Sequence, residues 1–134
     1  LRKFILLKNW DLDYLILTRE TNPVVRKRAE KLKIECFDSV DNKLEFIKKR
    51  LIDRFDEFEN SKKGLIYLGN DLNDYAAMKF SGFSISPNDA NITIKKISDI
   101  TLTKNGGCGF VREFIEKLLN FNSFNDSLFV ELLI

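Results

Sequence analysis

The chain has 134 residues, of which 44% are hydrophobic and 31% charged, and this suits one soluble domain with a core of its own. Its 22 basic and 20 acidic residues leave a net charge of +2, too balanced to favour nucleic acid or a membrane surface as a partner. The absence of histidine excludes a Ser-His-Asp triad and histidine-based zinc sites within this chain, and no membrane-spanning stretch or signal peptide is visible. The two cysteines, Cys36 and Cys108, lack metal-type spacing and indicate reduced thiols in a cytoplasmic protein.

Short apolar runs alternate with amphipathic stretches along the whole chain. Taken in chain order, the pattern predicts the end of a helix over 1–9, a strand over 14–18 that is buried on both faces, a helix over 22–33 with Pro23 in its first turn, a strand over 34–37, a long helix over 42–58, a strand over 65–68, a helix over 72–80, a strand over 83–86, a helix over 91–97, a strand over 100–103, a helix over 110–119 and a mixed tail over 120–134.

Strands that alternate with helices indicate an α/β fold with a parallel sheet covered on both faces. In such sheets the binding crevice lies at the carboxyl ends of the strands. The residues that directly follow each predicted strand are nearly all polar, small or charged, so we expect them to share one edge of the sheet. The sequence contains no internal linker or repeat, which indicates one domain over residues 1–119 followed by the tail.

Amide and carboxylate side chains cluster after the strand over 65–68, in the sequence "LGNDLND". Asn70, Asp71 and Asp74 offer oxygen atoms, the ligands that Mg²⁺ prefers when it also bridges to a phosphate. Thr18 offers a hydroxyl after an earlier strand, and Lys43 offers a positive charge at the start of a helix. A hydroxyl, an ammonium group and Mg²⁺ together suit a phosphoryl group as negative charge spreads over its oxygens.

Each of these features also has a purely structural interpretation. The loop "GNDLND" can be an Asx-turn that caps a helix, and "NGGCG" at 105–109 can be a simple turn. Thr18 alone can be a strand-end hydroxyl, and Lys43 alone a solvated helix residue. The four features together, each following a strand in this order, favour the functional interpretation.

The motifs "YLILTRETNPVVRKRAEKLKIE", "DNKLEFIK", "IYLGNDLNDYAAM" and "SPNDANITIKKISDITLTKNGGCGFVREFIEKLL" together resemble the haloacid dehalogenase-like (HAD-like) phosphatases. The resemblance covers residues 1–119. Within the family, the chain most resembles the 3-deoxy-D-manno-octulosonate 8-phosphate phosphatase branch. Within that branch it is similar to the domain fused behind acylneuraminate cytidylyltransferases, the CMP-sialate synthetases.

The resemblance implies a Rossmann-like fold and a Mg²⁺-dependent phosphatase for a sugar-acid phosphate, which works through an attacking aspartate. By position, Thr18 matches the hydroxyl that holds the phosphoryl group, and Lys43 matches the lysine that steadies charge around the nucleophile. The resemblance also assigns a metal-binding motif, Asn70, Asp71 and Asp74, and a substrate-binding loop and helix, Gly106, Gly107 and Arg112. It further implies a homo-oligomer, by analogy a tetramer, with an N-terminal cytidylyltransferase domain.

The sequence departs from the family pattern in two places. Asn70 stands where the family often has an aspartate, so one metal ligand loses its charge. The attacking aspartate of the family lies on a central first strand before residue 14, and Asp11 and Asp13 do not replace it because they precede their strand instead of following it. We therefore expect that the strands over 14–18 and 65–68 flank the place of that first strand, that the chain is part of a longer protein, and that alone it is inactive.

Two further functions compete with the phosphatase. A catalytically silent domain could support oligomerisation of a sialate-activating enzyme, and the apolar end of the tail, "SLFVELLI", suits either a subunit contact or packing on its own core. A receiver-like binding module fits the fold but does not explain Lys43 and the glycine loop.

Overall fold

The computed structural model describes residues 12–119. The predictions for residues 1–9, for Asp11, for the side chain of Leu119 and for the tail over 120–134 lie outside the described residues. The elements, in chain order, are β1 (Leu15–Leu17), α2 (Pro23–Leu32), β2 (Glu35–Phe37), α3 (Lys43–Arg54), α4 (Phe58–Lys63), β3 (Ile66–Leu68), the 3₁₀-helix η1 (Leu72–Asp74), α5 (Tyr75–Phe80), β4 (Phe83–Ser86), α6 (Ile92–Ile97), β5 (Ile100–Thr101) and α7 (Phe110–Leu119).

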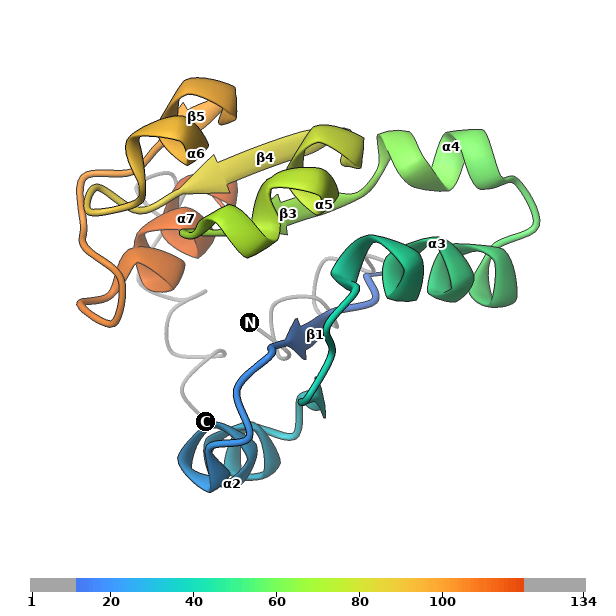
Figure 1. The fold of residues 1–134 in the computed structure, drawn as a ribbon, viewed down its shortest axis with the longest axis horizontal. Helices are drawn as coiled ribbons and strands as arrows, with labels where there is room; N and C mark the ends of the chain where they lie inside the picture. Colours follow the sequence, from blue (N-terminus) through green and yellow to red (C-terminus); the bar gives the residue numbers. More distant parts are fainter. Residues whose placement is uncertain (1–11, 120–134) are drawn as a thin grey trace, which may run out of the picture.

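The predicted α/β fold with parallel strands is confirmed, but the described strands form two sheets instead of one. β1 pairs with β2, with Ile16 opposite Cys36, and β3, β4 and β5 form the second sheet in that order. Figure 1 shows the two sheets in different parts of the molecule, with β1 and α2 on one side and β3, β4 and α5 on the other. Within residues 12–119, no backbone pairing joins β1 to β3.

The expectation that the run over 14–18 is buried on both faces is wrong for the described residues. All three residues of β1 are only half-buried. The physical reason is that β1 pairs only with β2 among the described strands. No described strand is paired along its other edge, so that edge stays uncovered. In the second sheet, Ile66 of β3 likewise keeps 38% of its surface exposed.

The core lies between α3, α5, α6 and the face of β3. Its buried side chains come from all of these elements and from the loop before α6: Ile47, Leu51, Tyr67, Ala77, Met78, Ala90 and Ile94. Leu17 of β1 packs against the same cluster. Helix α3 therefore joins the two sheets, since its C-terminal half also forms ion pairs through Arg50 with residues beside β1 and in β2.

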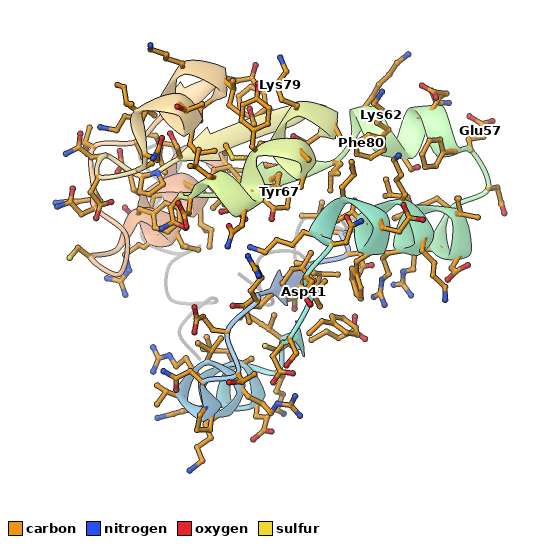
Figure 2. The ribbon with its side chains drawn as sticks, in the orientation of Figure 1. Asp41, Glu57, Lys62, Tyr67, Lys79 and Phe80 are labelled. Atoms are coloured by element: carbon orange, nitrogen blue, oxygen red, sulfur yellow. The ribbon has the colours of Figure 1, made fainter. Side chains whose placement is uncertain are left out.

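The long helix predicted over 42–58 is broken in the structure. Helix α3 ends at Arg54, Phe55 is extended, and α4 begins at Phe58. The break turns Phe58 toward Phe80, with ring centroids 6.0 Å apart. Lys62 lies over the same Phe80 ring, 5.1 Å from its centroid, as Figure 2 shows. Aromatic packing on α5 thus accompanies the break and stabilises α4 in its new direction.

Most of the remaining boundaries lie within one residue of the predictions, but the helix predicted over 72–80 is divided into η1 and α5, and the strand predicted over 100–103 ends at Thr101. Pro23 opens α2 as its first residue, and the strand at 83–86 and the helix at 110–119 have the predicted limits. The sequence spacing in this last helix also predicts an inward face made by Phe110, Phe114, Ile115, Leu118 and Leu119, but Leu118 is 40% exposed. Among residues 12–119, no helix has the length and apolar character needed to cross a membrane.

Candidate functional site

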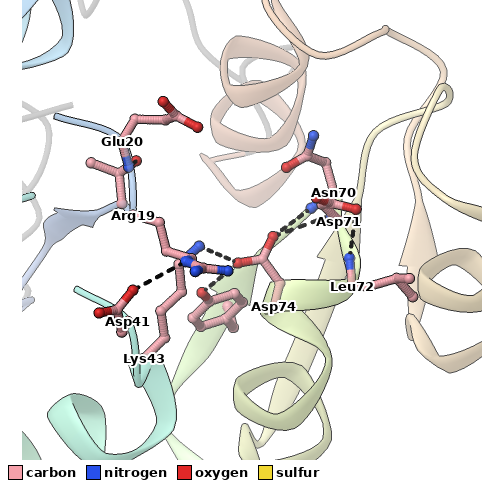
Figure 3. Close-up of polar contacts among 10 residues, drawn as sticks. Arg19, Glu20, Asp41, Lys43, Asn70, Asp71, Leu72 and Asp74 are labelled. Atoms are coloured by element: carbon pink, nitrogen blue, oxygen red, sulfur yellow. Dashed lines mark hydrogen bonds and ion pairs between the residues drawn. The ribbon is translucent and has the colours of Figure 1, made fainter. Parts of the chain in front are cut away.

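The ends of β1 and β3 and the start of α3 come together although they belong to different sheets. Thr18 follows β1, Lys43 is the first residue of α3, and Asn70 and Asp71 follow β3. Figure 3 shows Lys43, Asp74, Asn70 and Asp71 in one constellation with Arg19 and Asp41. The sequence predicted these groups at one edge of a single parallel sheet. In the structure Lys43 instead meets Asp74 and the N–H groups of Asn70 and Asp71 across two separate sheets.

Thr18 is fixed by its backbone and keeps a hydroxyl hydrogen available. Its N–H donates to Phe37 O at 3.0 Å, and its carbonyl accepts from Val40 N at 3.0 Å. Its Oγ1 accepts a hydrogen bond from Glu20 N at 3.0 Å. A hydroxyl that accepts in this way still has its own hydrogen to donate, so Thr18 can donate to an oxygen of a bound anion.

Lys43 and Asp74 form a buried ion pair at the centre of the site. Nζ of Lys43 lies 2.6 Å from Oδ1 of Asp74, and the two side chains are only 8% and 5% exposed. The helix start places Lys43 here because Asn42 caps α3 by accepting from Glu45 N at 3.1 Å. Lys43 is therefore not the solvated helix residue of the structural alternative.

The carboxylate of Asp74 is fully occupied by four donors. Its Oδ1 accepts from Lys43 and from the hydroxyl of Tyr67 at 2.9 Å, and its Oδ2 accepts from Asn70 N at 3.0 Å and Asp71 N at 3.3 Å. Burial alone raises the pKa of Asp74, but the hydrogen bond from Lys43, the N–H of Asn70 and the lysine charge outweigh it and lower the pKa.

Asp74 was predicted to be a metal ligand, and in the structure its carboxylate is held by four protein donors. Two carboxylate oxygens offer about four acceptor positions, and four donors already take them. Asp74 instead anchors Lys43 and the loop after β3.

Asn70 and Asp71, next to Asp74, are exposed and have side-chain oxygens that can act as metal ligands. Oδ1 of Asp71 accepts from Leu72 N at 2.7 Å and begins η1, so the predicted cap and the predicted ligand are the same residue. The second oxygen of Asp71 and the amide oxygen of Asn70 are chemically suitable for Mg²⁺, which binds through one or two protein groups together with waters and a phosphate. The donor set thus fits Mg²⁺ with two protein side chains, not three.

Gly69 is required for this arrangement because the backbone passes too close to its neighbours for a side chain. A Cβ at this position would lie 2.7 Å from Asp74 Cβ and 2.7 Å from Met78 Sδ. Real Cβ atoms do not approach other atoms so closely, so a larger residue here would displace Asp74. Gly69 therefore brings the end of β3 onto the helix that carries the anchor.

An exposed ion pair borders the site on the side of β1. Nε of Arg19 lies 3.3 Å from Oδ1 of Asp41, in the loop between β2 and α3. That loop contains Ser39 with φ of 57°, in the left-handed region that residues other than glycine seldom adopt. Because Val40 N donates to Thr18 O, the strained loop is tied to the end of β1 and leads directly into Lys43.

Asp13 has the structural role that its position before β1 implies. It lies in the loop before the strand, and its Oδ2 is 3.2 Å from Arg50 Nη2 and 3.4 Å from Arg54 Nε. These contacts fix the C-terminal half of α3 at the edge opposite Thr18. The interpretation of Asp13 as a loop residue outside the site is confirmed.

Gly106, Gly107 and Arg112 form a second group, in the loop before α7 and on its first turns. Gly107 has φ of 71°, which favours glycine, and Gly106 N donates to Asp89 Oδ1 at 2.7 Å. Arg112 lines an open pocket of about 330 Å³ together with Thr103, Lys104, Cys108, Gly109, Glu113 and Glu116. Cys108 and Gly109 thus bring the end of the glycine loop into the pocket wall, whereas Gly106 and Gly107 belong to the turn before it.

The loop between β4 and α6 connects the two groups of predicted site residues. Asn91 N donates to Asn70 O at 3.0 Å, while Asp89 of the same loop holds Gly106. From the sequence, Asp89 was grouped only with the polar residues after a strand and received no role, and Tyr67 was not considered. A signal for Tyr67 was present, since it is the one polar residue in the apolar strand "IYL" two positions before Gly69.

The known structures most relevant to this fold are hydrolases. No protein-family model matches the chain. A HAD family hydrolase from Streptomyces avermitilis superposes with a TM-score of 0.77 at 28% identity, over 92% of this chain and 70% of that one. The 3-deoxy-D-manno-octulosonate 8-phosphate phosphatase from Moraxella catarrhalis, solved with a magnesium ion, a phosphate ion and a KDO molecule, gives a TM-score of 0.68 at 28% identity, over 98% and 73%.

The phosphatase of the same name from Yersinia pestis gives a TM-score of 0.73 at 23% identity, over 87% of this chain and 60% of that one. The chain therefore spans less than two thirds of the length of that enzyme. These likenesses establish the class: the chain has a HAD-like α/β fold. More narrowly, its resemblance is to phosphatase-like hydrolases, among them those that act on an octulosonate phosphate.

Proposed function

We propose that the chain is part of a Mg²⁺-dependent phosphatase of the HAD type that acts on a sugar-acid phosphate, an octulosonate or acylneuraminate phosphate. The observation that carries the proposal is the buried Lys43–Asp74 pair, which lies where the ends of two separate sheets meet. A lysine held there beside a strand-end hydroxyl and two exposed oxygen donors provides binding groups for a phosphoryl group and its cation.

Each of the chain's own residues has a distinct role in this proposal. Thr18 donates its hydroxyl hydrogen to a phosphoryl oxygen, and Lys43 offers ammonium hydrogens that Asp74 does not use. Asn70 and Asp71 hold Mg²⁺, which when bound neutralises charge on the phosphoryl oxygens. Arg112 contacts the sugar-acid part of the substrate from the pocket that it lines, where its guanidinium suits a carboxylate. Gly106 and Gly107 belong to the loop that leads to this pocket and are proposed to contact the substrate through their backbone.

The attacking aspartate is proposed to lie on a further parallel strand between β1 and β3. Two observations support this position. The facing edges of β1 and β3 carry no partner strand among the described residues, and their side chains are less covered than those of a strand in the centre of a sheet. Residues 12–119 alone are therefore expected to be inactive, and activity belongs to the longer protein, which we propose carries an acylneuraminate cytidylyltransferase domain and forms a homo-oligomer.

The test is phosphate release by the full-length protein from eight-carbon and nine-carbon sugar-acid phosphates, with and without Mg²⁺. Lys43→Ala and Asp71→Ala are expected to lower kcat/KM by at least about a hundredfold, the order typical for lost electrostatic stabilisation. Lys49→Ala and Asp53→Ala are the matched controls, because both residues are exposed on α3. Release that persists in Lys43→Ala, or that needs no divalent cation, contradicts the proposal.

A second function, a catalytically silent domain that supports oligomerisation, is favoured by one specific observation. Asn70 carries no charge and Asp74 has no acceptor position left, so Asp71 is the one carboxylate among the three predicted ligands that remains available to a cation. Mg²⁺ binding, measured by calorimetry, distinguishes the phosphatase from the silent domain. Asn70→Asp is expected to lower the Mg²⁺ concentration needed for half-saturation several-fold in a phosphatase, because affinity rises with the charge of the ligands. A folded full-length protein that binds no Mg²⁺ and releases no phosphate supports the silent domain.

A further inference from the structure

Tyr67 is a buried polar residue that the roles above leave without a function. It occupies the middle of β3, it is 9% exposed, and its ring belongs to the core cluster with Ile47 and Met78. Its hydroxyl leaves this apolar surrounding to donate to Oδ1 of Asp74 at 2.9 Å. Figure 2 shows Tyr67 on the side of β3 and α5 that faces Asp41 and the start of α3. A phenylalanine would satisfy the core equally well, so the hydroxyl needs another explanation.

The hydroxyl of Tyr67 shares a single oxygen atom with Lys43. Oδ1 of Asp74 accepts from Tyr67 and, at 2.6 Å, from Lys43 Nζ, while Oδ2 is taken by two backbone N–H groups. A carboxylate oxygen has two lone pairs, and Tyr67 fills one of them. The direction from which Lys43 can approach Oδ1 is therefore set by Tyr67.

The contact matters because it crosses between the two sheets. Lys43 begins the helix that follows β2, whereas Tyr67 and Asp74 belong to β3 and to the turn after it. Thr18 follows β1 of the first sheet, whereas Asn70 and Asp71 follow β3 of the second sheet. The position of the ammonium group relative to both sides depends on the geometry at Asp74, since no backbone pairing of described residues joins β1 to β3.

We propose that Tyr67 is a positioning residue, whose hydroxyl orients the Asp74 carboxylate so that Lys43 is directed toward the strand ends where the phosphoryl group binds. The part of this inference that concerns phosphate rests on the proposed function. Burial and the neighbouring charge of Asp74 raise the pKa of Tyr67, so the phenol remains protonated and able to donate.

The test compares Tyr67→Phe with Tyr75→Phe in the full-length protein. Tyr75, on α5, is 40% exposed and serves as the control for loss of a hydroxyl. The first readout is the ¹⁵N–¹H signal of the Lys43 ammonium group, identified by its loss in Lys43→Met. Tyr67→Phe is expected to speed exchange of these protons with water about tenfold, because one hydrogen bond to a charged group is lost. Tyr75→Phe is expected to leave the signal unchanged.

The second readout is binding of inorganic phosphate in the presence of Mg²⁺, by calorimetry. The Kd is expected to rise about tenfold in Tyr67→Phe and to stay constant in Tyr75→Phe. An unchanged Lys43 signal in Tyr67→Phe overturns the inference, whatever the phosphate result. A changed signal in a protein whose wild type binds no phosphate overturns the proposed function and still supports the positioning of Lys43 by Tyr67.

A second variant covers the case in which Tyr67→Phe does not fold. 3-Fluorotyrosine at position 67 keeps the ring and the hydroxyl but makes the phenol a stronger donor. It is expected to shift the Lys43 ammonium signal, whereas the same substitution at position 75 leaves it in place. A Lys43 signal that does not respond to fluorination at position 67 overturns the inference.

Discussion

Replacing Lys43 by methionine is the most informative perturbation of this structure. The change keeps the length of the side chain and removes the charge that neutralises Asp74, whose side chain is 5% exposed. Breaking a buried ion pair by removing one partner typically costs about 3 to 5 kcal/mol, because a charge is left buried without compensation. Asp74 keeps three further donors, Tyr67 and the N–H groups of Asn70 and Asp71, so we expect the lower part of that range.

The expected loss in the free energy of unfolding is about 3 to 4 kcal/mol, measured by urea denaturation of the full-length protein at neutral pH. Lys49→Met, on the exposed face of the same helix, is the control and should change stability by less than about 0.5 kcal/mol. In an Asp74→Asn background, Lys43→Met should cost about 1 kcal/mol or less, because the buried charge is then absent. A loss below about 0.5 kcal/mol in the single variant would refute the reasoning.

Three further predictions concern the frame around the site. Lys33→Gly should raise the free energy of unfolding by about 0.5 to 1 kcal/mol in urea denaturation, because position 33 ends α2 with φ of 55°. Gly82→Ala should lower it by about 1 to 3 kcal/mol, since a Cβ there would lie 2.1 Å from Lys63 O. Lys117 and backbone N–H groups lower the pKa of Glu113 to about 2 in the folded protein, so its contribution to stability should be complete above pH 4.5 and fall away between pH 4.5 and about 2.

Each of these three predictions has its own control. Lys31→Gly lies inside α2 and should destabilise by about 1 kcal/mol, so equal effects at positions 31 and 33 would contradict the end-of-helix argument. For Gly82, Gly64→Ala is the comparison, since its nearest contact is an ordinary 3.6 Å. For Glu113, the stability difference between wild type and Glu113→Gln should be constant above pH 5 and shrink below it; a difference that grows on acidification would show that the carboxylate is not stabilised by its donors.

Local sequence signals were enough for the elements and for the edge at which the site lies. Pro23 marks the start of α2, the apolar runs mark the strands, and the polar residues after those strands meet, because parallel strands direct their carboxyl ends to one side. Lys43, Asn70, Asp71 and Asp74 could therefore be named from the sequence as neighbours. The hydrophobic spacing that reveals an element is a property of a few consecutive residues, so it needs no knowledge of the rest of the fold.

The roles of these neighbouring residues became clear only from the tertiary structure. The choice of Asp74 as an anchor instead of a metal ligand depends on which donors surround its carboxylate, and these come from α3, from β3 and from its own turn. Phe58 packs against Phe80 after the break between α3 and α4, and the incomplete cover of β1 depends on which strands pair. Such contacts join residues that are far apart in the chain, and the role of a side chain follows from the atoms around it. A pattern of residue types along the sequence specifies neither the long-range contacts nor the surrounding atoms.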